Sequence, residues 1–160
     1  MEWSEVDLKQ NLITIKAKRM KNKRIHTVPI TDYMKAILEE IKNYGFAGKC
    51  VFSTTKGRVP YRGWSKAKIQ FDKLTAFTDS WVYHDIRRTV RTGLPSIGIP
   101  HDISERVVSH TPSKLDQVYD HHDYLSQKRN ALEAWGIHLM AIIEDRKIGE
   151  NVERLADRRV

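Results

Sequence analysis

The sequence predicts an α+β protein that is mainly helical, with a small antiparallel β-sheet near its N-terminus. Two patterns predict this class: apolar residues alternate with a period of two before Pro29, and they recur every three or four residues after it. The length of 160 residues suits one domain with a hydrophobic core. With 40% hydrophobic and 30% charged residues, the composition excludes a disordered or collagen-like chain.

The first predicted elements form a β-hairpin. Apolar and polar side chains alternate over residues 12–16, and a second short run over residues 24–28 ends at Pro29. The polar segment 20–23 between the two runs is the predicted turn. A short third strand is predicted over residues 50–52, before a turn at Lys56–Gly57.

The rest of the chain is predicted to form five helices. The first begins at an N-cap, Thr31 or Asp32, and ends at Gly45. The others cover residues 63–74 and 84–94, a short segment capped by Asp102 or Ser104, and residues 123–145. Gly93 and Pro95 are predicted to end the 84–94 helix. Their apolar stripes are predicted to be core: Met34, Ile37, Leu38 and Ile41; Trp64, Ala67, Phe71 and Leu74; Ile86 and Val90; Ile103, Val107 and Val108; Leu125, Leu132, Trp135, Leu139, Met140 and Ile143.

Net charge indicates the class of partner. The chain carries 28 Lys and Arg against 20 Asp and Glu, a formal charge of +8. Its single cysteine excludes an internal disulfide framework and suits a reducing compartment, and no apolar run is long enough to span a bilayer. We therefore expect a basic cytoplasmic protein whose first expected partner is a polyanion such as nucleic acid.

Three segments concentrate reactive side chains. The first is the turn of the hairpin, where six of nine residues are cationic and can either be solvated or contact DNA phosphates: Lys16, Lys18, Arg19, Lys21, Lys23 and Arg24. The second is His84 with Arg87, which lie three apart and share a helix face, so that both can meet one anion.

The third segment begins at His110 and contains Tyr119, nine positions later, and then His121 and His122. Three imidazoles leave a zinc site open as an alternative, but no cysteine accompanies them and no helical His pair of the HExxH type is present. A lone tyrosine with its hydroxyl satisfied by packing is the other ordinary interpretation of Tyr119.

Taken in order, a hairpin lysine, His-x-x-Arg, His and then Tyr resemble the catalytic domain of the tyrosine recombinases, the phage integrase family. The opening Trp3–Leu8 is similar to the family's Trp-x-x-Val-Asp segment. Two further stretches, Arg19–Lys21 with His26–Ile30, and Tyr119–Leu125 with Arg129 and Trp135, resemble integrases of prophages and genomic islands. The resemblance covers about residues 1–140, and it implies the α+β catalytic fold of that family.

The resemblance also implies the site residues. The hairpin lysine matches Lys21, with Lys18 and Lys23 as neighbouring alternatives, and the nucleophile matches Tyr119, with Tyr124 as a less favoured one. The remaining matches are His84, Arg87 and His110. DNA contacts are implied for Lys16, Lys18, Arg19, Lys23 and Arg24.

The implied reaction is DNA cleavage and rejoining through a 3′-phosphotyrosyl link, with no cofactor and no metal. Arg87 and His110 would hold the nonbridging oxygens, His84 would take the tyrosine proton, and Lys21 would protonate the 5′-oxygen. The implied partners are a double-stranded DNA attachment site, other integrase protomers in a tetrameric synapse, and host or phage architectural proteins. The implied location is the bacterial cytoplasm, on the nucleoid when DNA is bound.

One departure from the family pattern limits this expectation. The family's first catalytic arginine precedes the Trp-x-x-Val-Asp segment, in a Thr-Gly-x-Arg context that these 160 residues do not contain. We therefore expect residues 1–143 to be a partial catalytic domain that is inactive alone, followed by a charged tail over residues 144–160. A DNA-binding remnant without catalysis and a type IB topoisomerase-like enzyme stay open as alternatives.

Overall fold

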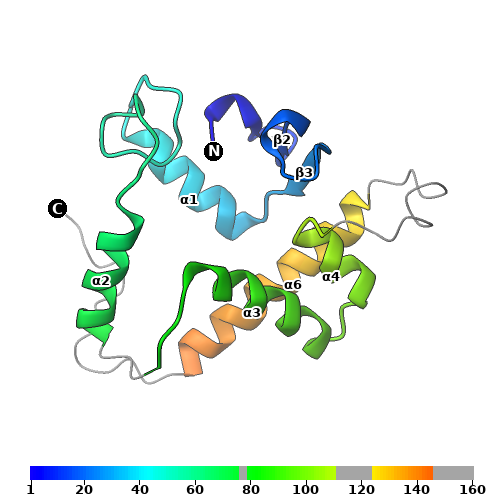
Figure 1. The fold of residues 1–160 in the computed structure, drawn as a ribbon. Helices are drawn as coiled ribbons and strands as arrows, with labels where there is room; N and C mark the ends of the chain where they lie inside the picture. The colour runs from blue at the N-terminus through cyan, green and yellow to red at the C-terminus, as the bar shows by residue number, and fades with distance from the viewer. Residues whose placement is uncertain (76–78, 111–123, 146–160) are drawn as a thin grey trace.

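The computed structural model of the protein describes residues 1–75, 79–110 and 124–145. A three-stranded antiparallel sheet lies at the N-terminal end, and helices make up most of the remainder (Figure 1). This arrangement confirms the predicted α+β class.

The sheet has the order β1-β2-β3, with strands Val6–Asp7, Leu12–Ile15 and His26–Pro29. Strands β2 and β3 are the predicted hairpin, and Leu12 pairs with Pro29 while Ile15 pairs with His26. Their connection is longer than the predicted turn, because a 3-10 turn, η2 (Ala17–Arg19), lies inside it. The cationic residues therefore occupy a long connection between two firmly paired strands.

The predicted strand over residues 50–52 is wrong. Among the described residues, this segment makes a single isolated bridge, between Glu2 and Cys50, next to the 3-10 turn η1 (Trp3–Glu5). The chain folds back here instead of extending, since the Cys50 amide donates to the Gly57 carbonyl at 3.0 Å and Gly57 has a φ of +79°. The third strand of the sheet is β1, from the opening segment of the chain.

Helix α1 (Asp32–Asn43) covers the sheet. The Thr31 hydroxyl accepts a hydrogen bond from the Met34 amide at 3.4 Å, so Thr31 is the N-cap of the two residues predicted for this position. Gly45, with a φ of +67°, follows the helix end. A first core joins helix and sheet through Ile13, Ile30, Leu38 and Val51.

Helices α3 (Tyr83–Ser96), α4 (His101–Val107) and α6 (Leu125–Asp145) form the second layer. Their core contains Leu94, Ile103, Ala131 and Trp135. The predicted end of α3 is wrong: Gly93 and Pro95 lie inside the helix, and the chain leaves it only before Gly98, with a φ of +86°.

The predicted N-caps of the short helix are also wrong. Pro100 precedes the first turn of α4, and Ser104 already lies within the helix, where its hydroxyl donates to the Pro100 carbonyl at 3.2 Å. Proline at this position has no N–H to satisfy, which suits a helix start.

Helix α2 (Trp64–Thr75) stands beside the two layers (Figure 1). Its stripe was predicted to be core, but Trp64 is 50% exposed and Leu74 is 85% exposed. Contact with α3 is aromatic, because the Trp64 ring lies edge-on to Tyr83, whose hydroxyl donates to the Trp64 carbonyl at 2.9 Å. The predicted helical period of this segment is therefore confirmed, and the predicted burial of its stripe is wrong. Several other stripe residues are also exposed: Ile37, Phe71, Ile86, Leu139 and Ile143.

Helix α6 is fastened to the sheet by two cationic side chains at its start. The buried Lys128 ammonium donates to the Thr27 carbonyl at 2.8 Å, and Arg129 donates to the carbonyls of Ile30 and Asn11 at 3.1 and 3.3 Å. These hydrogen bonds thus join the two layers next to β3, the strand that follows the cationic connection. No helix in the described part of the chain has the length and apolar character needed to cross a bilayer.

Candidate functional site

Three of the predicted site residues line one hollow of about 570 Å³: Lys21, Arg87 and His110. They come from the β2–β3 connection, from α3 and from the turn that follows α4. Met20, Asn22 and Ser109 are the other described residues that line it. An ammonium, a guanidinium and an imidazole that converge on one open hollow can bind an anion with several oxygen atoms.

The cationic connection is anchored two residues before Lys21. The Arg19 guanidinium pairs with the Glu5 carboxylate at 2.5 Å, and the Glu5 side chain is only 4% exposed. Burial raises the pKa of Glu5, but hydrogen bonds from the Glu2 amide and from Arg19 lower it by more, so the carboxylate stays ionised at neutral pH. This ion pair restrains the chain that carries Lys21.

Arg87 is fixed by the backbone of the neighbouring helix. Its Nη2 donates to the Val108 carbonyl at the end of α4, and the side chain is half-buried. The next arginine, Arg88, is exposed and paired with Asp85 at 2.8 Å, and it is not among the described residues that line the hollow. A single α3 arginine therefore reaches the hollow.

His110 is placed by the way in which α4 ends. Ser109 has a φ of +57°, its amide donates to the Arg106 carbonyl at 3.2 Å, and the His110 amide donates to the Glu105 carbonyl at 2.9 Å. These two hydrogen bonds form a Schellman motif, which turns the chain back over the last helical turn. The His110 Nδ1 then meets the Glu105 carboxylate.

His26 also belongs to this region, although the sequence pattern does not predict it as a site residue. It is half-buried at the start of β3, and its ring donates to the Val107 carbonyl. Burial and the nearby charges of Lys128 and Arg87 lower the pKa of His26, outweighing the hydrogen bond to Val107. No local pattern signals this role, because its partners lie on α3, α4 and α6.

The other predicted residues that the structure describes are not among those that line the hollow. His84 is exposed in the first turn of α3 and does not line the hollow among the described residues. Tyr119 lies outside the described residues. Tyr124 stacks on Arg106, whose guanidinium carbon is 3.9 Å from the ring centroid. The lysine alternatives, Lys18 and Lys23, are exposed and are not among the described lining residues.

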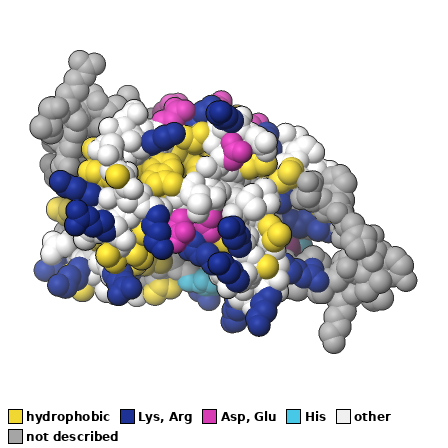
Figure 2. Space-filling model, turned by 90° about the horizontal axis from the view of Figure 1, so that it is seen from above, with side chains coloured by type: hydrophobic (Ala, Val, Ile, Leu, Met, Phe, Trp, Pro, Cys, Tyr) yellow, Lys and Arg dark blue, Asp and Glu magenta, His cyan; other side chains and the backbone are white. Residues whose placement is uncertain are grey.

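Lys16, Lys18, Lys23 and Arg24 are all exposed, as expected for contacts with a large anion. Arg19 is exposed as well, and its guanidinium is paired with Glu5. Figure 2 shows Lys and Arg side chains spread over the face seen from above, with few acidic groups among them. The predicted excess of positive charge is therefore on the surface.

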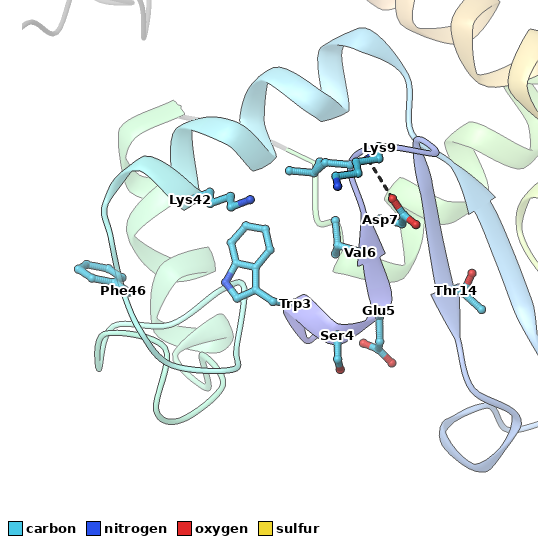
Figure 3. Close-up of a pocket in the computed structure, with 10 residues that line it drawn as sticks. Trp3, Ser4, Glu5, Val6, Asp7, Lys9, Thr14, Lys42 and Phe46 are labelled. Atoms are coloured by element: carbon cyan, nitrogen blue, oxygen red, sulfur yellow. Dashed lines mark hydrogen bonds between the residues drawn. The ribbon is translucent and has the colours of Figure 1, made fainter.

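A second hollow, of about 690 Å³, lies between the opening segment of the chain with β1 and the end of α1 (Figure 3). Trp3, Lys42 and Phe46 border it, and it contains none of the predicted catalytic residues. Within the described ranges, no three His, Cys, Asp or Glu side chains gather as a metal site would require. The alternative zinc ligands His121 and His122 lie outside those ranges.

Comparison with known proteins decides the family. The sequence model of the Phage integrase family matches residues 1–126. The chain belongs to the phage integrase family. It is 31% identical to prophage integrase IntA of Escherichia coli K12 over 135 residues, which are 83% of this chain and 32% of that protein.

Two further relatives agree with the assignment to the phage integrase family. The integrase of Shigella phage Sf6 and prophage integrase IntS of Escherichia coli K12 are each 24% identical over 143 residues, or 84% of this chain and 35% of theirs. The chain thus spans about a third of the length of these relatives. No solved structure matches it significantly.

Proposed function

We propose that this chain is the catalytic part of a site-specific DNA recombinase that integrates or excises a phage or genomic island. The proposal is supported above all by one observation: Lys21, Arg87 and His110, which are far apart in sequence, line the same hollow. Family membership supports the same function, and the charge of +8 suits a DNA substrate.

The proposed chemistry is a transesterification. The Tyr119 Oη attacks a backbone phosphorus, the bond from phosphorus to the 5′-oxygen breaks, and a 3′-phosphotyrosyl link forms. Arg87 and His110 stabilise the charge on the nonbridging oxygens, and Lys21 gives a proton to the departing 5′-oxygen. His84 receives the proton of the phenol. Attack by a 5′-hydroxyl on the phosphotyrosyl link then rejoins the strand, so no metal and no ATP is needed.

Chain connectivity supports Tyr119 as the nucleophile. It follows His110, a residue that lines the hollow, by nine positions, and nine residues can span at most roughly 30 Å. It precedes Tyr124 by five positions, and Tyr124 packs against Arg106 of the neighbouring helix α4. The stacked Tyr124 ring supports a structural role for that residue.

Activity is expected to depend on a second arginine. The family resemblance implies two arginines at the phosphate, and the described residues that line the hollow include one, Arg87. Loss of one such donor costs roughly 10²–10³ in rate, by analogy with an oxyanion hole. We therefore expect the 160-residue chain alone to cleave DNA far more slowly than a form extended N-terminally through a Thr-Gly-x-Arg segment. Equal cleavage by both would show that Arg87 suffices.

The remaining features follow from this proposal. Residues 1–143 act as the catalytic portion and residues 144–160 as a charged tail. The partners are a double-stranded attachment site and further integrase protomers, with architectural DNA-bending proteins as helpers in the bacterial cytoplasm.

The test is cleavage of a nicked suicide substrate by the extended form. The substrate carries the junction sequence of the element that encodes the chain. Its nick lets the short cleaved strand end diffuse away, so the covalent adduct accumulates. We expect Lys21→Ala to slow adduct formation by roughly 10²–10⁴, the range for a general acid, and Lys42→Ala, with the same change in charge beside the second hollow, to have no effect. Absence of any adduct would favour the DNA-binding remnant.

A further inference from the structure

The Glu105 carboxylate on α4 joins three groups around the hollow. Its Oε1 accepts from the Arg91 Nε at 2.5 Å and lies 3.3 Å from the His101 Nε2. Its Oε2 meets the Nδ1 of His110. The Glu105 side chain is 22% exposed, and Arg91 and His110 are each about twice as exposed. Glu105 is thus the inner member of the cluster.

The contact with Glu105 determines which nitrogen of His110 remains available. A carboxylate accepts only, so Nδ1 must carry the proton of that hydrogen bond. The other nitrogen, Nε2, is then the one left to interact with an anion in the hollow. A ring that also carries a proton on Nε2 can donate from that nitrogen to an anion.

The backbone alone does not fix the ring. The Schellman motif at Ser109 brings the main chain of His110 back to the Glu105 carbonyl, at 2.9 Å from the His110 amide. The side-chain torsions of His110 are still free to turn in that motif, and the Glu105 carboxylate removes this freedom. Arg91, one helical turn after Arg87 on α3, holds the carboxylate in turn.

The ionisation state of Glu105 suits this role. Burial raises its pKa, but hydrogen bonds from His110 and Arg91 lower it by more, so the net shift is below the ordinary value. The groups that face Glu105 are Arg91 from α3, His101 from its own helix, and His110 from the turn that follows. The described residues place no second carboxylate in this cluster.

We propose that Glu105 is a positioning residue for His110: it orients the imidazole so that Nε2 faces the anion in the hollow. The inference rests on the proposed function only in naming that anion as a DNA phosphate. Glu105 does not touch the substrate itself.

The experiment compares Glu105→Gln with two control variants. Asp102→Asn removes the same charge from an exposed position of α4. Arg91→Gln removes the ion pair of Glu105 with α3 and leaves the contact between Glu105 and His110. The first readout is the ¹⁵N spectrum of the His110 ring in the 160-residue chain, which reports the tautomer and needs no DNA. The second is the rate of suicide-substrate cleavage, and its pH profile, in the extended form.

We expect Glu105→Gln to change the His110 ring signals and to slow cleavage by roughly 10–100-fold, the usual effect of removing an outer partner of a functional histidine. Asp102→Asn should change neither, and Arg91→Gln should leave the ring tautomer as it is. Unchanged His110 signals in Glu105→Gln would overturn the inference, as would full cleavage activity.

The two proposals can fail separately. If the extended wild-type protein forms no adduct at all, the recombinase proposal fails. The positioning of His110 is then decided by titration with inorganic phosphate. A phosphate-dependent shift of His110 Nε2 that is lost in Glu105→Gln supports the inference, and an equal shift in both proteins overturns it.

Discussion

At the scale of single residues, each of the three predicted site residues that line the hollow is held by a different contact. Arg87 is fixed by the Val108 carbonyl, His110 by Glu105, and the chain before Lys21 by the ion pair of Arg19 with Glu5. Like charges at close range repel, so their convergence needs such anchors in the absence of a bound anion. A phosphate in the hollow would compensate the charges of Lys21 and Arg87, which is the physical basis of the proposed function.

The sequence identified some of these residues and missed others. The order Lys21, Arg87, His110 was sufficient to predict that the three converge, because it matches a family pattern. The sequence could not predict Glu105 or His26, because Arg91 and the partners of His26 come from other elements and neither residue has a distinctive spacing. Arg19 was assigned to DNA contact, and its pairing with Glu5 was not foreseen.

A first prediction concerns His26 and pH. Burial, Lys128 and Arg87 lower the pKa of His26 from its ordinary 6.5, so the unfolded chain takes up this proton at a higher pH than the folded one. The stability that His26 contributes is therefore complete above about pH 6.5 and is lost as the pH falls below it. Urea unfolding at pH 7.5 and 5.5 should show a smaller loss on acidification in His26→Gln than in the wild type. Equal losses would contradict the buried, neutral imidazole.

At the scale of elements, the helical periods were predictable and the burial of individual faces was not. The stripe of α2 has the spacing of a core face, yet Leu74 is 85% exposed. The spacing of apolar residues in a helix does not determine whether another element packs against that face. The predicted strand at residues 50–52 failed for a similar reason. Its apolar residues Cys50 and Val51 are buried, but through a folded-back loop and not through a strand ladder.

Gly93 shows how two helices approach each other closely, and it provides a second prediction. A Cβ at this position would lie 2.4 Å from ring carbons of Trp135, so Gly93→Ala forces α3 and α6 apart. Overpacking costs about 1–3 kcal/mol, and the better helix propensity of alanine returns about 1 kcal/mol. We expect a net destabilisation of up to about 2 kcal/mol in chemical denaturation.

The matched control for Gly93→Ala is Gly136→Ala on α6. Its Cβ would meet the ring of Tyr33 at 2.9 Å, but that side chain is half-exposed and can turn away. Alanine here should be close to neutral or slightly stabilising. Equal destabilisation by the two variants would contradict the close packing of Gly93 against Trp135.

At the scale of the whole molecule, the charge of +8 and the exposed cationic connection predict weak DNA binding that depends steeply on salt. If about three cations of the connection contact phosphates, the affinity should fall roughly 40-fold between 50 and 200 mM salt. Fluorescence anisotropy with a random-sequence duplex measures this slope.

Replacement of Lys16, Lys18 and Lys23 by glutamine should flatten the salt dependence of DNA binding. The same replacement of Lys9, Lys42 and Lys66, which lie outside the connection, should change it much less. An affinity that hardly changes with salt, or equal effects of the two sets, would show that the connection does not track the DNA backbone.

The most direct test of the central claim is to find which residue carries the DNA after cleavage. The extended form is incubated with the suicide substrate, digested with nuclease and trypsin, and the modified peptide is sequenced by fragmentation mass spectrometry. Trypsin releases residues 115–128, which contain both Tyr119 and Tyr124, so fragmentation must separate the two. We predict a 3′-phosphonucleotide on Tyr119 and no adduct in Tyr119→Phe. A nucleotide on Tyr124, or an adduct that survives Tyr119→Phe, would contradict the proposed site.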